Sequence, residues 1–256
     1  MITRFLDKFR ASKSTHRSMA IPFPDAQEIQ RRSGGEVRGE VIAFFTADSF
    51  YEQEAKRMMA SAVRLGLSAT ATAVTSAGSW VRNAALKPTF LLRERSVKRG
   101  PLLYVDVDAV FHRNPWPALT PFTGDVAVHY NHQGRLISAT ILINDTPAAV
   151  RLLALWKERC DKDPDVWDQI VLQDIIAEDQ ASAAPQFRVD ALPIAFCWIF
   201  DRLSNHRTDV VYIEQLQASR QATNKKRLFG RIKKNLRRRQ QRVRQIEIIL
   251  RAEKGG

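Results

Sequence analysis

The 256-residue chain has only two cysteines, Cys160 and Cys197, and neither lies in a CxxC motif or a Cys/His cluster. Two cysteines cannot form the disulfide framework of a small secreted domain, so we expect two thiols in a reducing compartment. No apolar run reaches the roughly 18 residues of a membrane-spanning helix. Met1–Arg10 also lacks the continuous apolar stretch of a signal peptide. These absences predict a cytoplasmic protein.

The sequence also lacks a Walker phosphate-binding loop and an evident Ser-His-Asp arrangement, which argues against two common classes of hydrolase. His129 and His132 lie near predicted strand ends. A lone histidine in such a position is more often structural than catalytic. The chemistry is therefore expected from other residues.

The net charge of +13 is concentrated at one end of the chain. Residues 225–256 hold thirteen lysines and arginines against two glutamates, so the body is close to neutral. Apolar residues of the tail recur at three- and four-residue intervals, with Arg239 in one of the apolar positions. The apolar positions are Phe229, Ile232, Leu236, Val243, Ile246 and Leu250. This spacing predicts a long basic amphipathic helix whose apolar seam needs a partner.

Short apolar runs predict strands at Val41–Thr46, Thr70–Val74 and Leu102–Val105. A helical pattern lies between the first two runs, and a second helical stretch, Asn83–Val97, is interrupted by Pro88. Continuous apolar strands that alternate with helices are typical of a parallel sheet covered on both faces.

The pattern changes after these units. Asp125–Tyr130 and Leu136–Ile143 are predicted as strands joined by a short turn, and two helices follow. Val189–Leu192 and Val210–Ile213 are predicted as short closing strands. We therefore predict an α/β fold with a mixed sheet flanked by helices. It would consist of a polar leader (1–36), one domain (37–222) and a basic helical tail (223–256).

Two carboxylates, Asp106 and Asp108, directly follow the third predicted strand. In open α/β sheets, ligands bind beyond the carboxyl ends of the strands. Two negative charges so close together repel each other unless a cation neutralises them. Oxygen ligands suit Mg²⁺ or Mn²⁺, which complete their coordination with water and substrate phosphates. A divalent metal on a diphosphate substrate is therefore predicted, the alternative being that the aspartates cap a turn or pair with arginines.

Several motifs in order carry a family resemblance. They are Lys87-Pro88, Asp106-Val107-Asp108 followed by Asn114-Pro115, Asp125-Val126-Ala127, Trp156, Asp168-Gln169, and Gln217-Ala218-Ser219-Arg220. In this order, over about Val41–Arg220, the chain resembles the GT-A nucleotide-diphospho-sugar transferases. The resemblance implies a GT-A (Rossmann-like) fold and a metal-dependent glycosyltransferase that moves a sugar from a nucleotide-diphosphate donor. The acceptor would be a glycan, a lipid-linked molecule or a protein, and retention of anomeric configuration is favoured.

The same resemblance implies roles for single residues. Asp106 and Asp108 would hold the metal, and Asp106 would also touch the donor ribose. The nucleoside and phosphates would be bound by Thr46, Tyr51, Asn83 and Lys87. Asp168 and Gln169 would be the catalytic pair, beside the donor sugar or the acceptor.

The chain departs from the family at the position of a histidine that can complete the metal site. Gln215 stands there, and a neutral amide oxygen is a weak ligand. Either Glu214 substitutes as the third ligand or the metal keeps another water. The acceptor strand also departs from the family pattern, at Ser138–Thr140.

Two rival functions remain. Asp106–Val110 also fits the DxDxV nucleophile motif of haloacid-dehalogenase-like phosphohydrolases. That motif normally opens its domain, whereas two strand–helix units precede it here. A nucleic-acid-binding protein acting through the tail is less favoured, because Phe229 is the only aromatic residue of the tail available to stack on bases.

The partner of the tail seam stays open between the body, a second copy and a lipid surface. An anionic membrane would make the protein peripheral at the inner face of a membrane. If the tail is such an anchor, a chain cut at about Thr223 should still hydrolyse the donor.

Overall fold

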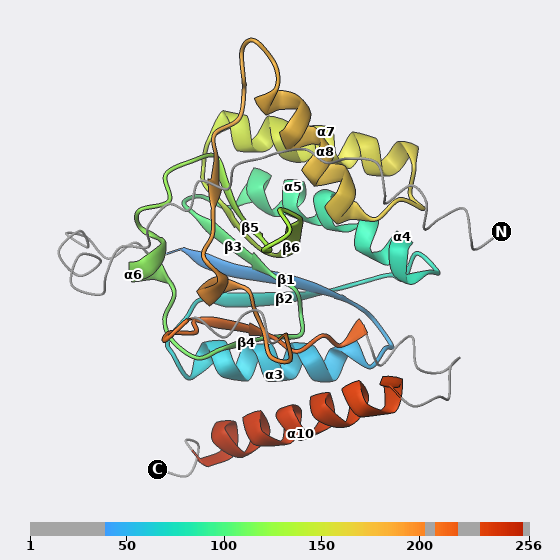
Figure 1. The fold of residues 1–256 in the computed structure, drawn as a ribbon, viewed down its shortest axis with the longest axis vertical. Helices are drawn as coiled ribbons and strands as arrows, with labels where there is room; N and C mark the ends of the chain where they lie inside the picture. Colours follow the sequence, from blue (N-terminus) through green and yellow to red (C-terminus); the bar gives the residue numbers. More distant parts are fainter. Residues whose placement is uncertain (1–38, 203–207, 220–230, 253–256) are drawn as a thin grey trace.

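The computed structural model describes residues 39–202, 208–219 and 231–252, so the predicted leader lies outside the described residues (Figure 1). The strands are β1 Glu40–Thr46, β2 Ala69–Val74, β3 Leu102–Val105, β4 Ala109–Phe111, β5 Val126–Tyr130, β6 Leu136–Ile143, β7 Val189–Ala191, β8 Trp198–Ile199 and β9 Ile213–Gln215. The helices are α3 Tyr51–Val63, α4 Trp80–Ala85, α5 Lys87–Val97, α6 Trp116–Leu119, α7 Pro147–Lys162, α8 Asp168–Gln180, the short 3₁₀ helix η1 Ile194–Phe196 and α10 Arg231–Ala252.

The main sheet has six strands in the order β2-β1-β3-β6-β5-β7. β1 pairs in parallel with β2 and β3, whereas β6 runs antiparallel to both β3 and β5. β7 is parallel to β5. The predicted mixed α/β fold is confirmed, and the carboxyl end of β3 meets the antiparallel half of the sheet.

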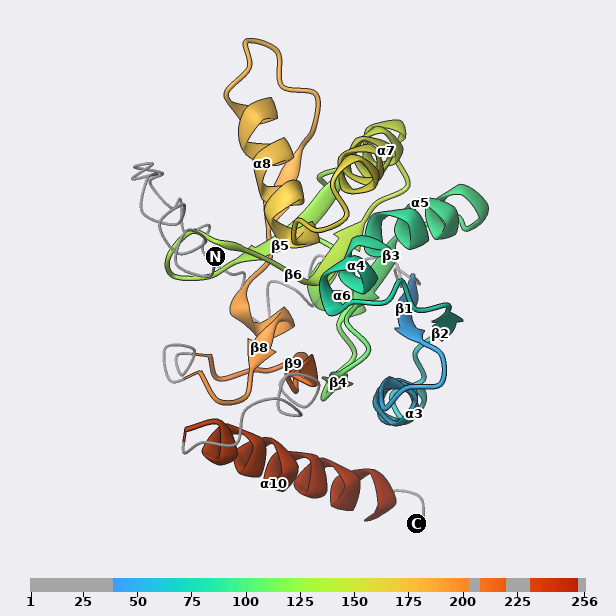
Figure 2. The same ribbon diagram turned by 90° about the vertical axis from the view of Figure 1, so that its right-hand side faces the viewer.

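Helices cover both faces of this sheet. α4, α5, α7 and α8 lie on one side and α3 on the other (Figures 1 and 2). Successive side chains of a strand point to opposite faces, so Leu102 and Tyr104 enter the core under α5, α7 and α8. Leu103 and Val105 enter the core shared with α3. This burial on both faces explains why β3 reads as an unbroken apolar run.

Two boundaries differ from the sequence prediction. The helical stretch over residues 83–97 is two helices that meet at Leu86, because Pro88 lies in the first turn of α5, where its missing N–H costs nothing. The strand predicted at Val210–Ile213 instead begins at Ile213 and ends at Gln215. The apolar pattern could not predict its second half because Glu214 and Gln215 are polar. In the fold both are fully buried and hydrogen-bonded.

β9 is the centre of a second, three-stranded sheet in the order β4-β9-β8. β4 follows directly after Asp108, and its Ala109 is in register with Gln215 of β9. This small sheet lies between the main sheet and the C-terminal helix (Figure 2). It fixes the chain directly after the two aspartates, and β3 of the main sheet fixes the chain directly before them.

The tail helix α10 packs on the body. Ile246 is buried against Val110 and Leu216, with Val243 and Leu250 beside it. The Arg239 guanidinium is buried as well, at 3% exposed, and its Nη2 lies 2.6 Å from Glu54 Oε1. Of the partners left open for the apolar seam, the structure therefore selects the body. The predicted Phe229 position lies outside the described residues.

Among the described residues, no helix is both long enough and apolar enough to cross a bilayer. Mean hydropathy over the chain is −0.29.

Candidate active site

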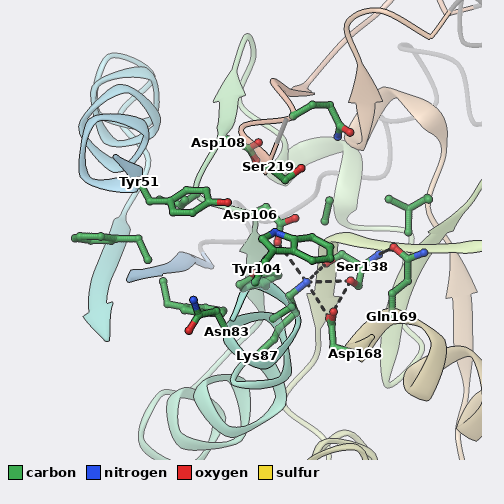
Figure 3. A pocket seen from close by; sticks show the side chains of 18 of the residues that line it. Tyr51, Asn83, Lys87, Tyr104, Asp106, Asp108, Ser138, Asp168, Gln169 and Ser219 are labelled. Atoms are coloured by element: carbon green, nitrogen blue, oxygen red, sulfur yellow. Dashed lines mark hydrogen bonds and ion pairs between the residues drawn. The ribbon is translucent and has the colours of Figure 1, made fainter. Parts of the chain in front are cut away.

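Asp106 and Asp108 line an open cleft at the carboxyl end of β3 (Figure 3). The cleft has a volume of about 1040 Å³, including open solvent at its mouth. Its lining includes the sequence-predicted residues Thr46, Tyr51, Asn83, Lys87, Asp106, Asp108, Asp168 and Gln169. The fold thus brings eight predicted residues from four stretches of the chain to one hollow, as expected where strands end in an α/β sheet.

Lys87 lies at the centre of the polar network in the cleft floor. Its Nζ is 3.3 Å from Asp106 Oδ1 and 3.1 Å from Asp168 Oδ2, and it donates to Ser138 Oγ at 2.9 Å (Figure 3). Burial opposes the charge of this ammonium, yet the two carboxylates outweigh it and hold the pKa of Lys87 above its ordinary value. Lys87 was predicted to face the donor phosphates. Its ammonium contacts two carboxylates in the cleft, and its role toward the phosphates stays a prediction.

Asp168 is fully buried at the start of α8. Burial raises its pKa, the charge of Asp106 adds to the rise, and the ion pair with Lys87 opposes it. Its neighbour Gln169 lines the cleft and accepts a hydrogen bond from Ser138 N at 3.4 Å. The predicted catalytic pair therefore lies beside Asp106, and Asp168 is already paired.

Tyr104 was missed by the sequence analysis as a site residue. Its hydroxyl donates to Asp106 Oδ1 at 2.8 Å, and Lys87 Nζ lies 5.2 Å from the centre of its ring. Burial, followed by the charge of Asp106, raises the pKa of Tyr104 well above its ordinary value, so the phenol stays a donor. The signal available was its position two residues before Asp106, which places both on the same face of the extended segment.

Asp108 is held by the segment that follows β9. Leu216 N donates to its backbone oxygen at 3.1 Å, and Ala218 N donates to its Oδ2. Between them Gln217 has a φ of +56°, a left-handed conformation that is costly for a side chain other than glycine. Burial and the neighbouring charge of Asp106 raise the pKa of Asp108 to about 7, while the Ala218 hydrogen bond opposes the rise.

The predicted nucleoside and phosphate residues lie on the β1 side of the cleft. Thr46 ends β1 and is buried, and its Oγ1 donates to Ser49 Oγ at 3.1 Å. The hydroxyl of Tyr51 faces the two aspartates (Figure 3). Burial and the charges of Asp108 and Asp106 raise the pKa of Tyr51, so this hydroxyl stays neutral. Asn83 lines the cleft, while its Oδ1 accepts from Ala77 N at 2.6 Å and so fixes the loop before α4.

The structure does not bring Glu214 into the cleft. Its Oε2 is 2.7 Å from His112 Nε2, and Arg242 of α10 binds both of its oxygens at 2.7 Å. Neighbouring residues of a strand point to opposite faces, so Glu214 lies in a separate hollow with His112 and Arg242. We therefore withdraw Glu214 as a candidate third metal ligand.

Gln215 points the other way, toward β6. Its Nε2 donates to Ala139 O and Thr140 Oγ1, both at 3.1 Å. Ala139 O also accepts from Asp106 N, so this amide lies directly behind the aspartate turn. Within the described residues, Gln215 Oε1 is buried and has no hydrogen-bond partner. As a neutral third ligand Gln215 stays a prediction.

Comparison with known proteins decides the family. The sequence model of the nucleotide-diphospho-sugar transferases matches residues 92–229, which is more than half of the chain and includes both aspartates and the Asp168-Gln169 pair. The chain belongs to this family. The transferase has no match among curated protein sequences.

Solved structures support the fold of the transferase. A glycosyltransferase involved in glycosylation of the major capsid of PBCV-1 is similar with a TM-score of 0.51 at 9% identity, over 70% of this chain and 92% of that one. The glycosyltransferase GlyE of Streptococcus pneumoniae TIGR4 has a TM-score of 0.47 at 11% identity, over 79% of this chain and 60% of that one. The first similarity confirms the predicted GT-A fold. The second is too weak to carry an argument.

The family assignment also bears on the rival functions. A DxDxV nucleophile motif opens the phosphohydrolase domain, whereas in the transferase Asp106 follows the third strand of the chain and lies mid-sheet. The enzyme is therefore a nucleotide-sugar-dependent glycosyltransferase, and the phosphohydrolase alternative is not supported.

A Lys87→Met substitution tests the polar network. It would leave Asp168 buried without its counter-charge, so we expect a loss of roughly 3–5 kcal/mol in the free energy of unfolding, measured by chemical denaturation. The double variant Lys87→Met/Asp168→Asn should recover most of this loss, because the remaining carboxylate, Asp106, is partly exposed to water and still hydrogen-bonded by Tyr104. Lys56→Met, at an exposed position of α3, serves as the matched control. Equal stability of Lys87→Met and this control would contradict the network.

Proposed function

We propose that the transferase binds its donor diphosphate through a divalent cation, Mn²⁺ or Mg²⁺, at Asp106 and Asp108. The observation that carries this proposal is the charge of the cleft. Asp106, Asp108 and Asp168 line it against only two cations, Lys87 and Arg202, among the described residues. A diphosphate entering such a surface would meet repulsion, and a divalent cation removes it.

The residues present fit such a cation. No cluster of three or more His, Cys, Asp or Glu side chains occurs in the described part of the chain, so the protein would supply two carboxylates. Magnesium-type ions commonly take one or two carboxylates and complete their shell with water and substrate phosphates. Burial and then the charge of Asp106 raise the pKa of Asp108, and a bound cation would favour its charged form. When bound, the cation would stabilise charge on the departing diphosphate.

The remaining residues of the cleft would orient the reactants. Tyr104 and Lys87 fix Asp106 from one side, which leaves its position set before the donor arrives. Gln169, held by Ser138 N, would contact the donor sugar or the acceptor hydroxyl. Thr46 and Tyr51 would bind the nucleoside, and Asn83 would hold the loop beside it.

Retention of anomeric configuration is the favoured outcome. An inverting reaction needs a carboxylate base on the acceptor hydroxyl. Of the three carboxylates that line the cleft, two would hold the cation and Asp168 is fully buried and paired with Lys87. With no uncommitted carboxylate among the described lining residues, holding the acceptor against the departing diphosphate is the better-supported route.

A peripheral membrane contact is proposed for the outward face of α10. Arg237, Arg238 and Arg244 are exposed there, and Ile248 is 67% exposed. Basic side chains beside an apolar one suit an anionic lipid surface at the inner face of a membrane. Such a contact would bring the cleft to lipid-linked acceptors.

A thermal-shift screen tests the proposal. Nucleotide sugars are added with and without Mn²⁺ to the wild type and to Asp108→Ala. We expect one donor to raise the melting temperature in the presence of Mn²⁺, because a ligand that binds only the folded state stabilises it. The rise should vanish in Asp108→Ala and without metal. A donor that stabilises both proteins equally in EDTA would refute the metal site.

A further inference from the structure

Two tryptophans at the mouth of the cleft have no part in the donor site described above. Trp80 opens α4 and Trp167 caps α8, and both line the cleft. They are 43% and 39% exposed. Of the large apolar side chains exposed in the part of the chain that the structure describes, these are the two aromatic ones. Large apolar groups left in water at a cleft mouth mark a binding surface.

The two rings are arranged as a pair. Their centroids are 5.7 Å apart and their planes are inclined at 55°. The elements that carry them are joined by a two-pronged ion pair, in which Arg82 Nε and Nη2 lie 2.8 and 3.0 Å from the two oxygens of Asp165. The Ser79 side chain caps α4 by accepting from Arg82 N at 3.2 Å. The segments that carry the two rings are thus linked before any ligand is present, which lowers the entropic cost of binding.

The two tryptophans lie next to the residues predicted to bind the donor and to carry the reaction. Trp167 directly precedes the Asp168-Gln169 pair in the chain, and Trp80 lies on α4, the helix that also carries Asn83. The rings therefore span the cleft mouth from the predicted nucleoside side to the predicted sugar side. A ligand on them would lie at the solvent side of the polar network around Lys87.

We propose that Trp80 and Trp167 form the acceptor subsite and stack against the apolar face of a neutral hexopyranose at the end of a glycan chain. This rests on the proposed function, because a sugar transferase needs an acceptor as its second substrate in the same cleft. A pyranose ring presents C–H groups on one face and hydroxyls on its edge, and the negative face of an indole ring attracts the C–H groups. The hydroxyl edge would stay within reach of Gln169 and Asn83, which line the same cleft.

The donor is a weaker occupant for the pair. Its diphosphate would be held through the cation at Asp106 and Asp108, whereas the two rings carry no charge that would attract a phosphate. The acceptor enters from solvent and meets the rim first. A lipid acyl chain would need a continuous apolar groove, whereas Arg82 and Asp165 make the rim beside the rings polar.

The test uses the full chain saturated with Mn²⁺ and UDP or GDP, and neutral disaccharides (lactose, cellobiose and maltose) as probes. Saturation-transfer NMR should show ring C–H protons of at least one disaccharide in contact with the wild type. Trp80→Ala and Trp167→Ala should each weaken this disaccharide by about tenfold, and Trp80→Phe and Trp167→Phe should keep most of the affinity. Trp198→Phe, at a tryptophan of the separate hollow around Glu214, is the matched control.

Each other result overturns the proposal. No contact with any disaccharide, or equal weakening by the Ala and Phe variants, would show that the rings do not stack on a pyranose. A tenfold loss of nucleotide affinity in the Ala variants, with sugar contact unchanged, would assign the rings to the donor. Failure of the proposed function is distinguishable, because the wild type would then bind neither UDP nor GDP in a metal-dependent way.

Discussion

The Asp108→Asn variant is expected to transfer sugar roughly a hundred- to a thousandfold more slowly than the wild type at saturating donor. Asparagine keeps the shape of the side chain and can still accept from Ala218 N, but it removes one of the two negative charges that would hold the cation. The measurement is release of nucleoside diphosphate across a Mn²⁺ titration, with Mn²⁺ affinity measured separately by calorimetry. Asp161→Asn, on the exposed face of α7, is the matched control.

The Asp108→Asn substitution should also change the pH dependence of the free energy of unfolding. The pKa of Asp108 is about 7 in the folded protein, raised by burial and by Asp106 from an ordinary value of 3.8. Without metal, the folded state therefore holds a proton that the unfolded chain releases, and the free energy of unfolding falls as the pH rises between about 4 and 7. Melting temperatures of the wild type in EDTA should drop over this range relative to those of Asp108→Asn.

Metal reverses the sign of this effect. A ligand carboxylate must be deprotonated to bind, so Mn²⁺ affinity should rise with pH up to about 7 and then level off. Mn²⁺ should then stabilise the wild type most at about pH 8 and stabilise Asp108→Asn little at any pH. A wild type whose EDTA melting curve runs parallel to that of Asp108→Asn from pH 4 to 8 would contradict this account of the site.

The sheet could be predicted because its strands are buried on both faces. β3 and β6 were predicted with their observed bounds, since an unbroken apolar run such as Leu102–Val105 has few other stable placements. β9 was misplaced because its burial depends on polar partners far away in the chain. Arg242 and His112 bind Glu214 in the fold, and no local sequence pattern predicts these contacts.

The residues of the site could likewise be predicted only where the signal is local in the sequence. Asp106 and Asp108 could be predicted from their place after a buried strand, which is a local signal. That the Lys87 ammonium binds two carboxylates could not, because Asp168 lies about eighty residues away and reaches it only in the folded chain. Tyr104 was taken as an ordinary strand residue, although its hydroxyl binds Asp106. The sequence thus indicates which residues carry charge, while their pairing is a tertiary property.

The tail is the part of the chain where the sequence prediction and the structure differ most. Its basic amphipathic pattern left the partner of the seam open, and only a membrane anchor was expected to be removable at about Thr223 without loss of donor hydrolysis. In the structure α10 covers Val110 and Leu216, and three of its side chains form ion pairs with side chains of the body. The three are Arg239 on Glu54, Arg242 on Glu214 and Glu247 on Arg57. Cutting the chain at Thr223 is therefore expected to destabilise the whole domain and to abolish donor hydrolysis.

Arg239 links the tail helix to the segment that holds Asp108. Its Nε donates to Leu216 O at 3.0 Å, and Leu216 N in turn donates to Asp108 O. The guanidinium thus braces the segment whose next residues hold the Asp108 carboxylate, through Ala218 N. Arg239→Ala should cost roughly 1–3 kcal/mol in the free energy of unfolding, because Leu216 O loses its donor and buried Glu54 loses one of its two arginine partners while keeping Arg57. It should also weaken Mn²⁺ binding.

A second variant separates bracing from stability. Arg239→Met with Glu54→Gln removes both charges, so most of the stability should return, but no donor then reaches Leu216 O. Its Mn²⁺ affinity should stay below that of the wild type, whereas Arg238→Ala, exposed on the adjacent position, should match the wild type in both measurements. If the double variant regains full Mn²⁺ affinity, α10 acts on stability alone. Weak metal binding at restored stability would show instead that the C-terminal helix helps to position Asp108, some 130 residues before it in the chain.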